Sequence, residues 1–466
     1  MVWGSLCVAL FTAIYPAVRA FYRVEITYNE GWNVYNASAV AQHQVLYPAA
    51  YGWTTVNYPM LSFVIVTWLH RFTHDYLFTA RVLSLLATMG CGVLAGCVVR
   101  QVTGSVRAAW IAAAYCIAMF CAVADFYVGQ DDPAMLALAV FMVGLLVYVS
   151  RRRSLVALAG AAALFVVAGS IKHDPMGFPL AVALDLLLLS WRRALWFCLW
   201  GAGFLAMAVW LNLHFGGPGF LMQLFAPRTF SWTKGLEQLG TVFGSLLLPF
   251  AAAVYAAWIE FENARMRVLS LLLVIGLVLG VVFGGGTGVS VNAEFTAMLA
   301  VAMLLGVALE RIARGEWRWA GPGIQAYAPM AMLLWMVIPM IVCDTWNPVG
   351  KLRQTAADQR LFDEDVAFLR ARNGPALCES LLRCYFAGKP FVYDPFNATR
   401  LIEFHKLDDA VIVNSLQQHA YGAVEIDGSQ EDDAFPDRFD PRIAAAINQT
   451  YHPVLMHEGA KIYLPR

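Results

Sequence analysis

Two apolar runs and the basic residues between them decide the fold: PAMLALAVFMVGLLVYVS (residues 133–150), RRR (151–153) and LVALAGAAALFVVAGSI (155–171). As an α-helix, each run would be about 26–27 Å long, close to the roughly 30 Å of a membrane's hydrocarbon core. The three arginines between the runs would remain in water at the membrane surface. The stretch therefore predicts a helical hairpin that crosses a membrane twice.

Nine further apolar runs occur along the chain, so we predict eleven membrane-spanning helices. The first could also be a signal peptide, but it has no basic region before it, which favours an uncleaved helix. The nine further runs are Val2–Val18, Ala80–Val99, Ala108–Phe126, Met176–Ser190, Ala194–Leu213, Leu239–Trp258, Val268–Phe283, Ala293–Leu309 and Ile324–Val342.

The composition agrees with a membrane protein. Of the 466 residues, 60% are hydrophobic and 14% are charged, against about 45–50% and 25% in average soluble domains. The mean hydropathy is +0.60. Lys plus Arg and Asp plus Glu both number 32, so no overall positive field is available to hold a nucleic acid. We therefore expect membrane lipids as the surroundings and no nucleic-acid partner.

The arginines predict which loops face the cytoplasm. Every second loop carries them, and by the positive-inside rule these loops are cytoplasmic; they hold Arg100 and Arg107, Arg151 to Arg153, Arg192 and Arg193, Arg265 and Arg267, and Arg311, Arg314 and Arg318. The other loops would face the periplasm. The apolar run Pro59–Leu69 covers only about 16 Å as a helix, which favours an interfacial helix. If it did span, the first loop would lie on the opposite side.

The chain after Asp344 has a different composition, with many polar residues and short apolar runs at Pro390–Tyr393, Ala410–Val413 and Lys461–Leu464 that resemble strands. We predict two parts: a transmembrane domain at 1–343, whose first periplasmic loop is 19–79, and a small periplasmic α/β domain at 344–466. Cys378 and Cys384 could form a disulfide in an oxidising compartment or remain thiols.

Polar and aromatic residues gather in the predicted periplasmic loops. The first loop contains Asn29-Glu30 and then the aromatic residues Trp32 and Tyr35. The segment Tyr58-Pro59-Met60-Leu61 follows, and Arg81 lies at the start of the next span. Two later loops carry Gln130-Asp131-Asp132-Pro133 and Lys172-His173. The concentration of these groups on one face predicts that any chemistry takes place there.

The order of these motifs resembles the GT-C superfamily of polyprenyl-phosphate-sugar glycosyltransferases. This superfamily includes protein O-mannosyltransferases, aminoarabinose transferases and bacterial lipopolysaccharide sugar transferases. The resemblance covers most of the chain and implies an all-α polytopic membrane fold of about eleven spans. Interfacial helices would lie in the first loop, and a small α/β domain would follow at the C-terminus.

The resemblance also implies roles for particular residues. Asn29 stands where many members have a catalytic Asp, so the base would be Glu30, with Asp131 or Asp132 as the substitute. The donor phosphate would be bound by Lys172, His173 and Arg81. Substrate-binding residues would be Asn29, Trp32, Tyr35, Tyr58 and Asn292.

Chemical reasoning from the residues leads to the same groups. Transfer of a sugar from a lipid phosphate to a hydroxyl needs a base for the hydroxyl proton and cations for the departing phosphate. A single carboxylate suits direct, inverting displacement, because retention would require a second group as nucleophile. The loop His214–Gln238 carries Arg228 and Lys234 among aromatic residues; it could anchor at the interface or cover the lipid donor.

The sequence therefore predicts a glycosyltransferase of the bacterial inner membrane with its active site on the periplasmic face. Its donor would be a polyprenyl-phosphate sugar and its acceptor a lipid, glycan or protein hydroxyl. No metal ligands are predicted, and participation of a divalent metal is left open. The alternatives are a transporter or flippase of lipid-linked sugars, which should show repeated halves and charges near mid-span, and a polymer ligase.

Overall fold

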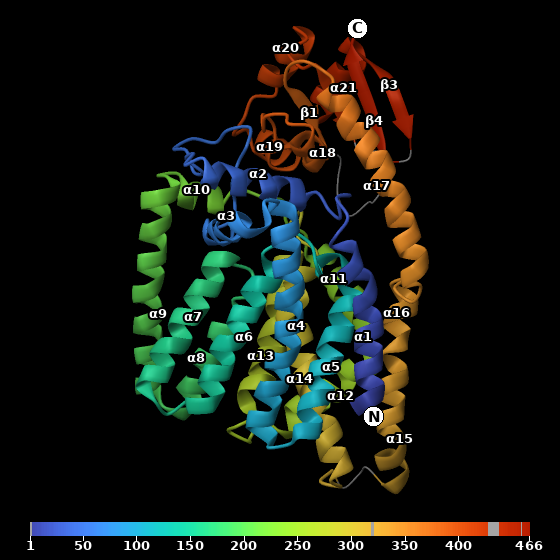
Figure 1. Cartoon of the computed structure of the whole chain (residues 1–466). Helices are drawn as coiled ribbons and strands as arrows, with labels where there is room; N and C mark the ends of the chain where they lie inside the picture. The colour runs from blue at the N-terminus through green and yellow to red at the C-terminus, as the bar shows by residue number, and fades with distance from the viewer. Residues whose placement is uncertain (1, 318–320, 427–437, 458) are drawn as a thin grey trace.

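The computed structural model describes residues 2–317, 321–426, 438–457 and 459–466. Its long helices form a bundle, and a small α/β domain covers one end, which we call the domain end (Figure 1). The bundle helices are α1 (Val2–Arg19), α4 (Tyr76–Thr103), α5 (Val106–Val123), α6 (Ala134–Arg151), α7 (Leu155–Ile171), α8 (Gly177–Leu189), α9 (Trp191–Leu211), α11 (Trp232–Ser245), α12 (Leu247–Ile259), α13 (Arg267–Gly284), α14 (Phe295–Ala313), α15 (Pro322–Trp335) and α16 (Val337–Val342).

All eleven predicted apolar runs are helical for most of their length. Among the described residues, eight helical segments are long and apolar enough to cross a membrane, and the bent pair α11 and α12 would make a ninth. Helices α7 and α8, with 17 and 13 residues, are shorter. The all-α polytopic fold is therefore confirmed, and the number of eleven spans stays a prediction.

Helix α14 forms the centre of the bundle. All its residues from Phe295 to Glu310 are buried. Small residues allow this close packing: a Cβ on Gly306 would lie 2.9 Å from the Cβ of Ala112 and 3.0 Å from the carbonyl oxygen of Ala108, both in α5. Close approach of backbones through small residues is the usual way in which helices associate within a membrane.

The run Leu239–Trp258, predicted as one span, is broken. Helices α11 and α12 meet at an angle of 99°. Pro249 has no N–H, so it cannot bond to the carbonyl oxygen of Ser245 four residues before it. That oxygen instead accepts a hydrogen bond of 3.1 Å from the indole nitrogen of Trp335. The run predicted as one span is therefore a pair of helices bent at Leu246, and its crossing of the membrane stays a prediction.

The arginine-rich loops lie at the end of the bundle opposite to the α/β domain, which we call the arginine end (Figure 1). They join α4 to α5, α6 to α7, α8 to α9, α12 to α13 and α14 to α15. Arg318 lies outside the described residues. The alternation predicted from the sequence is therefore present as two chemically different ends, and the compartment that each end faces stays a prediction.

Two short helices lie between the bundle and the α/β domain (Figure 1). They are α2 (Asn29–Ala41) and α3 (Leu61–Thr73), of 13 residues each. A helix of 13 residues is about 20 Å long, too short to span. On α3, Trp68 and Phe72 are exposed, as expected for a helix that rests on the membrane interface. The helices predicted in the first loop are confirmed.

The C-terminal part contains a four-stranded sheet in the order β1-β2-β4-β3. Strands β1 and β2 are parallel, with Ala376 opposite Ala423, and the other pairs are antiparallel. The elements are α17 (Pro348–Arg370), β1 (Ala376–Cys378), α18 (Leu381–Phe386), α19 (Pro395–Glu403), α20 (Ala410–Gln417), β2 (Ala423–Ile426), α21 (Pro441–Thr450), β3 (Tyr451–His457) and β4 (Ala460–Pro465).

Only one of the three predicted strands is present. Lys461–Leu464 lies in β4, as predicted. Pro390–Tyr393 has no regular structure, and Ala410–Val413 begins helix α20. The helix forms because Ile412 and Leu416, four residues apart, share one buried face.

The α/β domain packs tightly on α2. Gly31 faces the backbone of Leu381 and Leu382 at the start of α18, where a side chain on Gly31 would clash. The disulfide between Cys378 and Cys384 joins β1 to this helix. Of the two alternatives left open for the cysteines, the structure contains the paired one. The domain therefore fixes the position of α2, which carries Asn29 and Glu30.

Candidate active site

A cavity of about 330 Å³ opens at the domain end of the bundle. Its walls come from the end of α7, the loop before α3 and the 3-10 turn η3 (Val291–Glu294). The loops that follow α13 and the short helix α10 (Phe220–Leu224) complete them. Polar side chains from these segments converge on it. The polar lining residues are Asn29, Asn57, Tyr58, Tyr127, Lys172, His173, Asp174, Arg228 and Asn292.

Lys172 lies at the inner wall of the cavity. It is the residue that ends α7, in an extended conformation, and its side chain is only 2% exposed. Its Nζ donates to the two carboxylate oxygens of Asp132 at 2.8 and 3.1 Å. The ammonium also lies 4.8 Å from the centre of the Tyr58 ring and 5.7 Å from that of Tyr127, so its charge is held by a carboxylate and two aromatic faces.

The charge on Lys172 is stable in these surroundings. Burial acts to lower the pKa of Lys172, but the Asp132 carboxylate, followed by Tyr58 and Asp174, outweighs it and holds the pKa well above the ordinary value. A buried lysine without carboxylates would instead lose its proton. Lys172 therefore remains a cation at neutral pH.

Asp174 is the carboxylate most open to the cavity. Its side chain is 23% exposed, and Oδ2 lies 3.7 Å from Nζ of Lys172. The same oxygen accepts a hydrogen bond of 2.7 Å from the amide of Asn292, whose Oδ1 accepts one of 2.7 Å from the hydroxyl of Tyr127. Burial raises the pKa of Asp174, but Lys172, His173 and Arg228 lower it further, so its net pKa lies below the ordinary value. Asp174 is therefore ionised at neutral pH.

His173 and Arg228 add two more nitrogen donors to the cavity wall. Burial lowers the pKa of His173 from the ordinary value, so the imidazole is neutral at neutral pH. Its Nδ1 is buried and has no hydrogen-bond partner among the described residues. Arg228 comes from the loop after α10, and its guanidinium makes only a long contact of 3.5 Å with the carbonyl oxygen of Thr287. No carboxylate among the described residues forms an ion pair with Arg228.

Glu30 and Arg81 lie behind the cavity, and neither lines it. Both side chains are fully buried, and Nη2 of Arg81 lies 2.5 Å from Oε2 of Glu30. Oε1 of Glu30 also accepts from Nε of Arg81 and from the backbone N–H of Asp131, at 2.7 and 3.0 Å. Oε2 accepts from the N–H of Ile26 at 2.7 Å. The carboxylate predicted as the base and the guanidinium predicted to bind phosphate thus hold each other.

The two adjacent aspartates have different surroundings. Asp132 is fully buried against Lys172 and accepts a 3.2 Å hydrogen bond from the amide of Asn29. Asp131 points to the Glu30 side, and burial raises its pKa well above the ordinary value, with further contributions from Glu30 and Asp132. The ionised form of Asp131 is therefore disfavoured in the folded protein, whereas Asp132 has the Lys172 ammonium as its partner.

The remaining predicted residues divide into two groups. Asn29, Tyr58 and Asn292 line the cavity. Trp32 instead packs edge-on against Tyr58 at 5.1 Å, and Tyr35 stacks on Phe391 at 4.8 Å and donates to the carbonyl oxygen of Lys389. The rings of Trp32 and Tyr35 are thus engaged within the protein.

Asp174 and Arg228 line the cavity but were not among the predicted site residues. Asp174 could have been found because it follows Lys172 and His173 directly. Arg228 lies in a loop for which anchoring and covering the donor were both open, and its position at the cavity fits the second alternative. Within the described parts of the chain, no group of three or more His, Cys, Asp or Glu is placed to hold a metal ion.

Comparisons with solved structures identify the fold. ArnT from Cupriavidus metallidurans bound to undecaprenyl phosphate superposes with a TM-score of 0.62, at 12% identity over 98% of this chain and 97% of that one. The archaeal oligosaccharyltransferase AglB from Archaeoglobus fulgidus, in complex with an inhibitory peptide and a dolichol-phosphate, gives a TM-score of 0.51 at 11% identity over 99% and 74% of the two chains. Neither a family model nor a curated protein sequence matches the chain.

These likenesses define the class of fold. ArnT and AglB are both members of the GT-C superfamily, so the resemblance predicted from the sequence motifs is confirmed at the level of the fold. The chain shares the fold of these two proteins, and eight helical segments among its described residues are long and apolar enough for a multi-pass membrane protein. The reaction must be inferred from the residues around its own cavity.

Proposed function

We propose that this protein is an integral membrane glycosyltransferase that moves a sugar from a polyprenyl-phosphate donor to a hydroxyl group. The observation that carries the proposal is the cavity at the domain end. It combines a buried cation, Lys172, with the ionised carboxylate of Asp174 and the donor groups of His173 and Arg228. This is the set of groups that departure of a phosphate and deprotonation of an alcohol require.

The donor phosphate would be held by Lys172, His173 and Arg228. The Lys172 ammonium acts as a point charge, and Arg228 can grip two phosphate oxygens at once. His173 can donate one neutral N–H. Arg81, the third member of the phosphate set predicted from the sequence, would act indirectly in this geometry, because its guanidinium is bound to Glu30.

The acceptor hydroxyl would be activated by a carboxylate, for which our first candidate is Asp174, which lines the cavity, and our second is Asp132, which is buried against Lys172. The base takes the hydroxyl proton as the oxygen attacks the anomeric carbon, and the bond between that carbon and the phosphate oxygen breaks. The phosphate leaves with the electron pair, next to Lys172. A single displacement of this kind inverts the anomeric centre.

Glu30 would then be a positioning residue. Its bonds to Arg81, to Ile26 and to the backbone of Asp131 connect α2, α4 and the loop that carries Asp132. If Glu30 were the base, as predicted from the sequence, its ion pair with Arg81 would have to open. A base and a positioning residue therefore differ in how substitution of Glu30 affects the stability of the protein.

We infer that the cavity faces the periplasm of a bacterial cell and that the protein resides in the inner membrane. The arginine loops at the far end support this orientation through the positive-inside rule. The disulfide on the domain side fits an oxidising compartment. The acceptor class, whether lipid, glycan or protein, stays open.

A transfer assay with the full chain tests the proposal. Purified protein in lipid nanodiscs would be incubated with a panel of radiolabelled polyprenyl-phosphate sugars and with an envelope extract as acceptor. We expect label to leave the lipid for at least one donor and to do so much more slowly in Asp174→Asn. Movement of an intact donor across a vesicle membrane without transfer would instead identify a flippase and overturn the proposal.

A further inference from the structure

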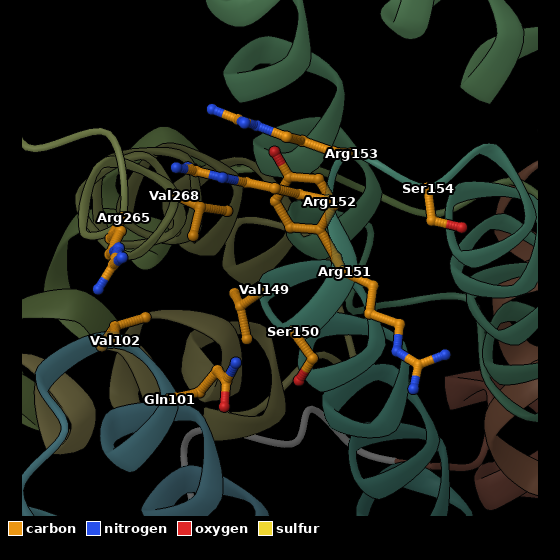
Figure 2. Close-up of a pocket in the computed structure, with 11 residues that line it drawn as sticks. Gln101, Val102, Val149, Ser150, Arg151, Arg152, Arg153, Ser154, Arg265 and Val268 are labelled. Atoms are coloured by element: carbon orange, nitrogen blue, oxygen red, sulfur yellow. The ribbon is translucent and has the colours of Figure 1, made fainter.

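A second and larger cavity lies at the arginine end of the bundle, far from the candidate active site. Its volume is about 660 Å³. Four of its lining residues are Arg151, Arg152, Arg153 and Arg265. Arg151 ends α6, Arg152 and Arg153 lie in the connection between α6 and α7, and Arg265 lies in the connection between α12 and α13. We call this the arginine pocket (Figure 2).

The arginines reach the pocket from two walls. In Figure 2, the side chains of Arg152 and Arg153 run beside each other, and that of Arg265 comes from the neighbouring helix connection. Arg151 points to the other side. Arg152 donates from Nη1 to the carbonyl oxygen of Ala264, which ties the two connections together. Two cationic groups, Arg153 and Arg265, are thus left to face the space.

The absence of an acidic partner sets this pocket apart. No Asp or Glu lines it among the described residues. Other arginines at the same end have carboxylates: Arg107 and Arg314 pair with Glu310, and Arg311 pairs with Glu260. Within the described chain, no ion pair is formed by Arg153 or Arg265.

Asp185, which contacts the lining residue Tyr148, is already engaged. It accepts from Nε of Arg267 at 2.7 Å and from the hydroxyl of Tyr148. Concentrated positive charge without a counter-charge is unfavourable for the protein alone. An anion in the pocket would remove that cost.

The surroundings indicate which anion. Leu155 and Val156, in the first turn of α7 directly after the lining residue Ser154, are exposed, and Val156 is 84% exposed. In a membrane this apolar surface would lie against acyl chains. A ligand with a phosphate in the pocket and chains along α7 satisfies both features, whereas a water-soluble phosphate would use only the first.

We propose that the arginine pocket binds the phosphate headgroup of an anionic phospholipid from the leaflet opposite to the candidate active site. Basic pockets between transmembrane helices bind such headgroups through phosphate contacts. Two guanidinium groups can each donate two parallel hydrogen bonds to phosphate oxygens. The proposal does not depend on the reaction at the domain end.

The test compares lipids bound to the full-length protein. Protein in detergent would be given phosphatidylglycerol or phosphatidylcholine, and bound lipid would be counted by native mass spectrometry. We expect the wild type to prefer phosphatidylglycerol, and Arg153→Gln/Arg265→Gln to bind it at least about 10-fold more weakly, from two lost cationic contacts. This pair of substitutions leaves the Arg152 contact with Ala264 in place.

The matched control is Arg192→Gln/Arg193→Gln, which removes two charges at the same end of the bundle but outside the pocket. It should keep the wild-type preference. An equal loss in both double variants would mean a general interfacial charge effect and would overturn the proposal. Saturable binding of glycerol phosphate without any preference for phosphatidylglycerol would overturn the assignment to a lipid.

A measurement on the wild type alone keeps the proposal falsifiable if the double variant does not fold. The preference for phosphatidylglycerol should weaken as NaCl rises from about 0.05 to about 0.5 M, because salt screens charge contacts. A preference that does not change with salt, or no preference at all, would contradict the proposal.

Discussion

Arg81 and Glu30 form a fully buried ion pair, with Nη2 and Oε2 separated by 2.5 Å, where the first turn of α2 crosses the start of α4. The remaining donors of Arg81 go to the backbone oxygens of Tyr22 and Val24. All the strong hydrogen-bonding groups of the pair are therefore used within the protein. This relationship makes the difference between a catalytic and a positioning role for Glu30 measurable.

Replacement of Glu30 by Gln should destabilise the protein. It leaves the Arg81 guanidinium buried without its counter-charge, which costs about 3–5 kcal/mol in comparable cases. We expect a clear fall in the apparent melting temperature of the purified protein, measured in detergent, together with loss of transfer activity.

Glu30→Gln would behave differently if Glu30 were a base with no role in the stability of the fold. If Glu30→Gln kept the wild-type melting temperature and lost only the rate constant, Glu30 would be the base and our positioning role would be wrong. The control is Glu30→Met/Arg81→Met. By removing both charges, this variant should regain part of the stability lost in the single variant.

Replacement of Lys172 by Met should lower the rate constant of transfer by on the order of 10²-fold, more than it lowers donor affinity. The extra charge on the phosphate develops during the reaction, so its stabilisation acts beyond the ground state. Steady-state kinetics on Lys172→Met and Lys172→Arg measure the rate constant and the donor affinity separately. Unchanged kinetics in Lys172→Met would contradict a role of this lysine at the departing phosphate.

The two adjacent aspartates should respond differently to conversion to Asn. Burial raises the pKa of Asp131, so its charged form is disfavoured in the folded protein, and Asn removes that charge. Asp131→Asn should keep or increase stability at neutral pH, because a raised pKa in the folded state disfavours folding as the pH rises. Asp132→Asn removes the counter-charge of Lys172 and should lower both stability and activity. Equal effects of the two substitutions, in thermal unfolding at pH 7, would contradict this distinction.

Arg228 should contribute to donor binding and Lys234 should not. Lys234 is the matched control, because it lies in the first turn of α11, directly after the loop that carries Arg228, but donates to the backbone oxygens of Gly286 and Val289. We expect Arg228→Gln to raise the KM for the donor about 10-fold and Lys234→Gln to leave it near the wild-type value. Titration of the donor in the transfer assay measures both, and a larger effect in Lys234→Gln would refute the assignment.

The pH dependence of transfer should reflect a carboxylate base. Asp174 has a net pKa below the ordinary value: burial raises it, but Lys172, His173 and Arg228 lower it further. It stays ionised as the pH falls from about 8 to about 5, so the rate should remain level over this range. A fall in rate over that range that disappears in His173→Asn would assign the base to the histidine.

The helices were predictable because an apolar run long enough to cross a membrane satisfies its backbone hydrogen bonds there as a helix. The prediction failed where a local contact decided the structure. The run Leu239–Trp258 bends at Leu246, where Pro249 cannot bond to the carbonyl oxygen of Ser245 and Trp335 does so instead. The run Ala410–Val413 has the residue types of a strand but forms a helix, because its buried face follows a spacing of four residues.

For the site, the motifs indicated which segments meet but not which side chains face the cavity. Lys172 and Asp132 were predicted at one face, and the structure brings them to 2.8 Å. The pairing of Glu30 with Arg81 depends on how two helices cross, and their 51 residues of separation contain no signal of it. Arg228 reaches the cavity through the path of an irregular loop, which hydrophobic periodicity does not describe.

Binding of undecaprenyl phosphate to the purified full-length protein in nanodiscs tests the central claim, that the cavity at the domain end holds the donor phosphate. The wild type and the control Arg192→Gln/Arg193→Gln should bind with equal affinity, whereas Lys172→Met/Arg228→Gln should bind at least about 10-fold more weakly, because two cationic contacts are lost. Equal affinity in all three proteins would contradict the account.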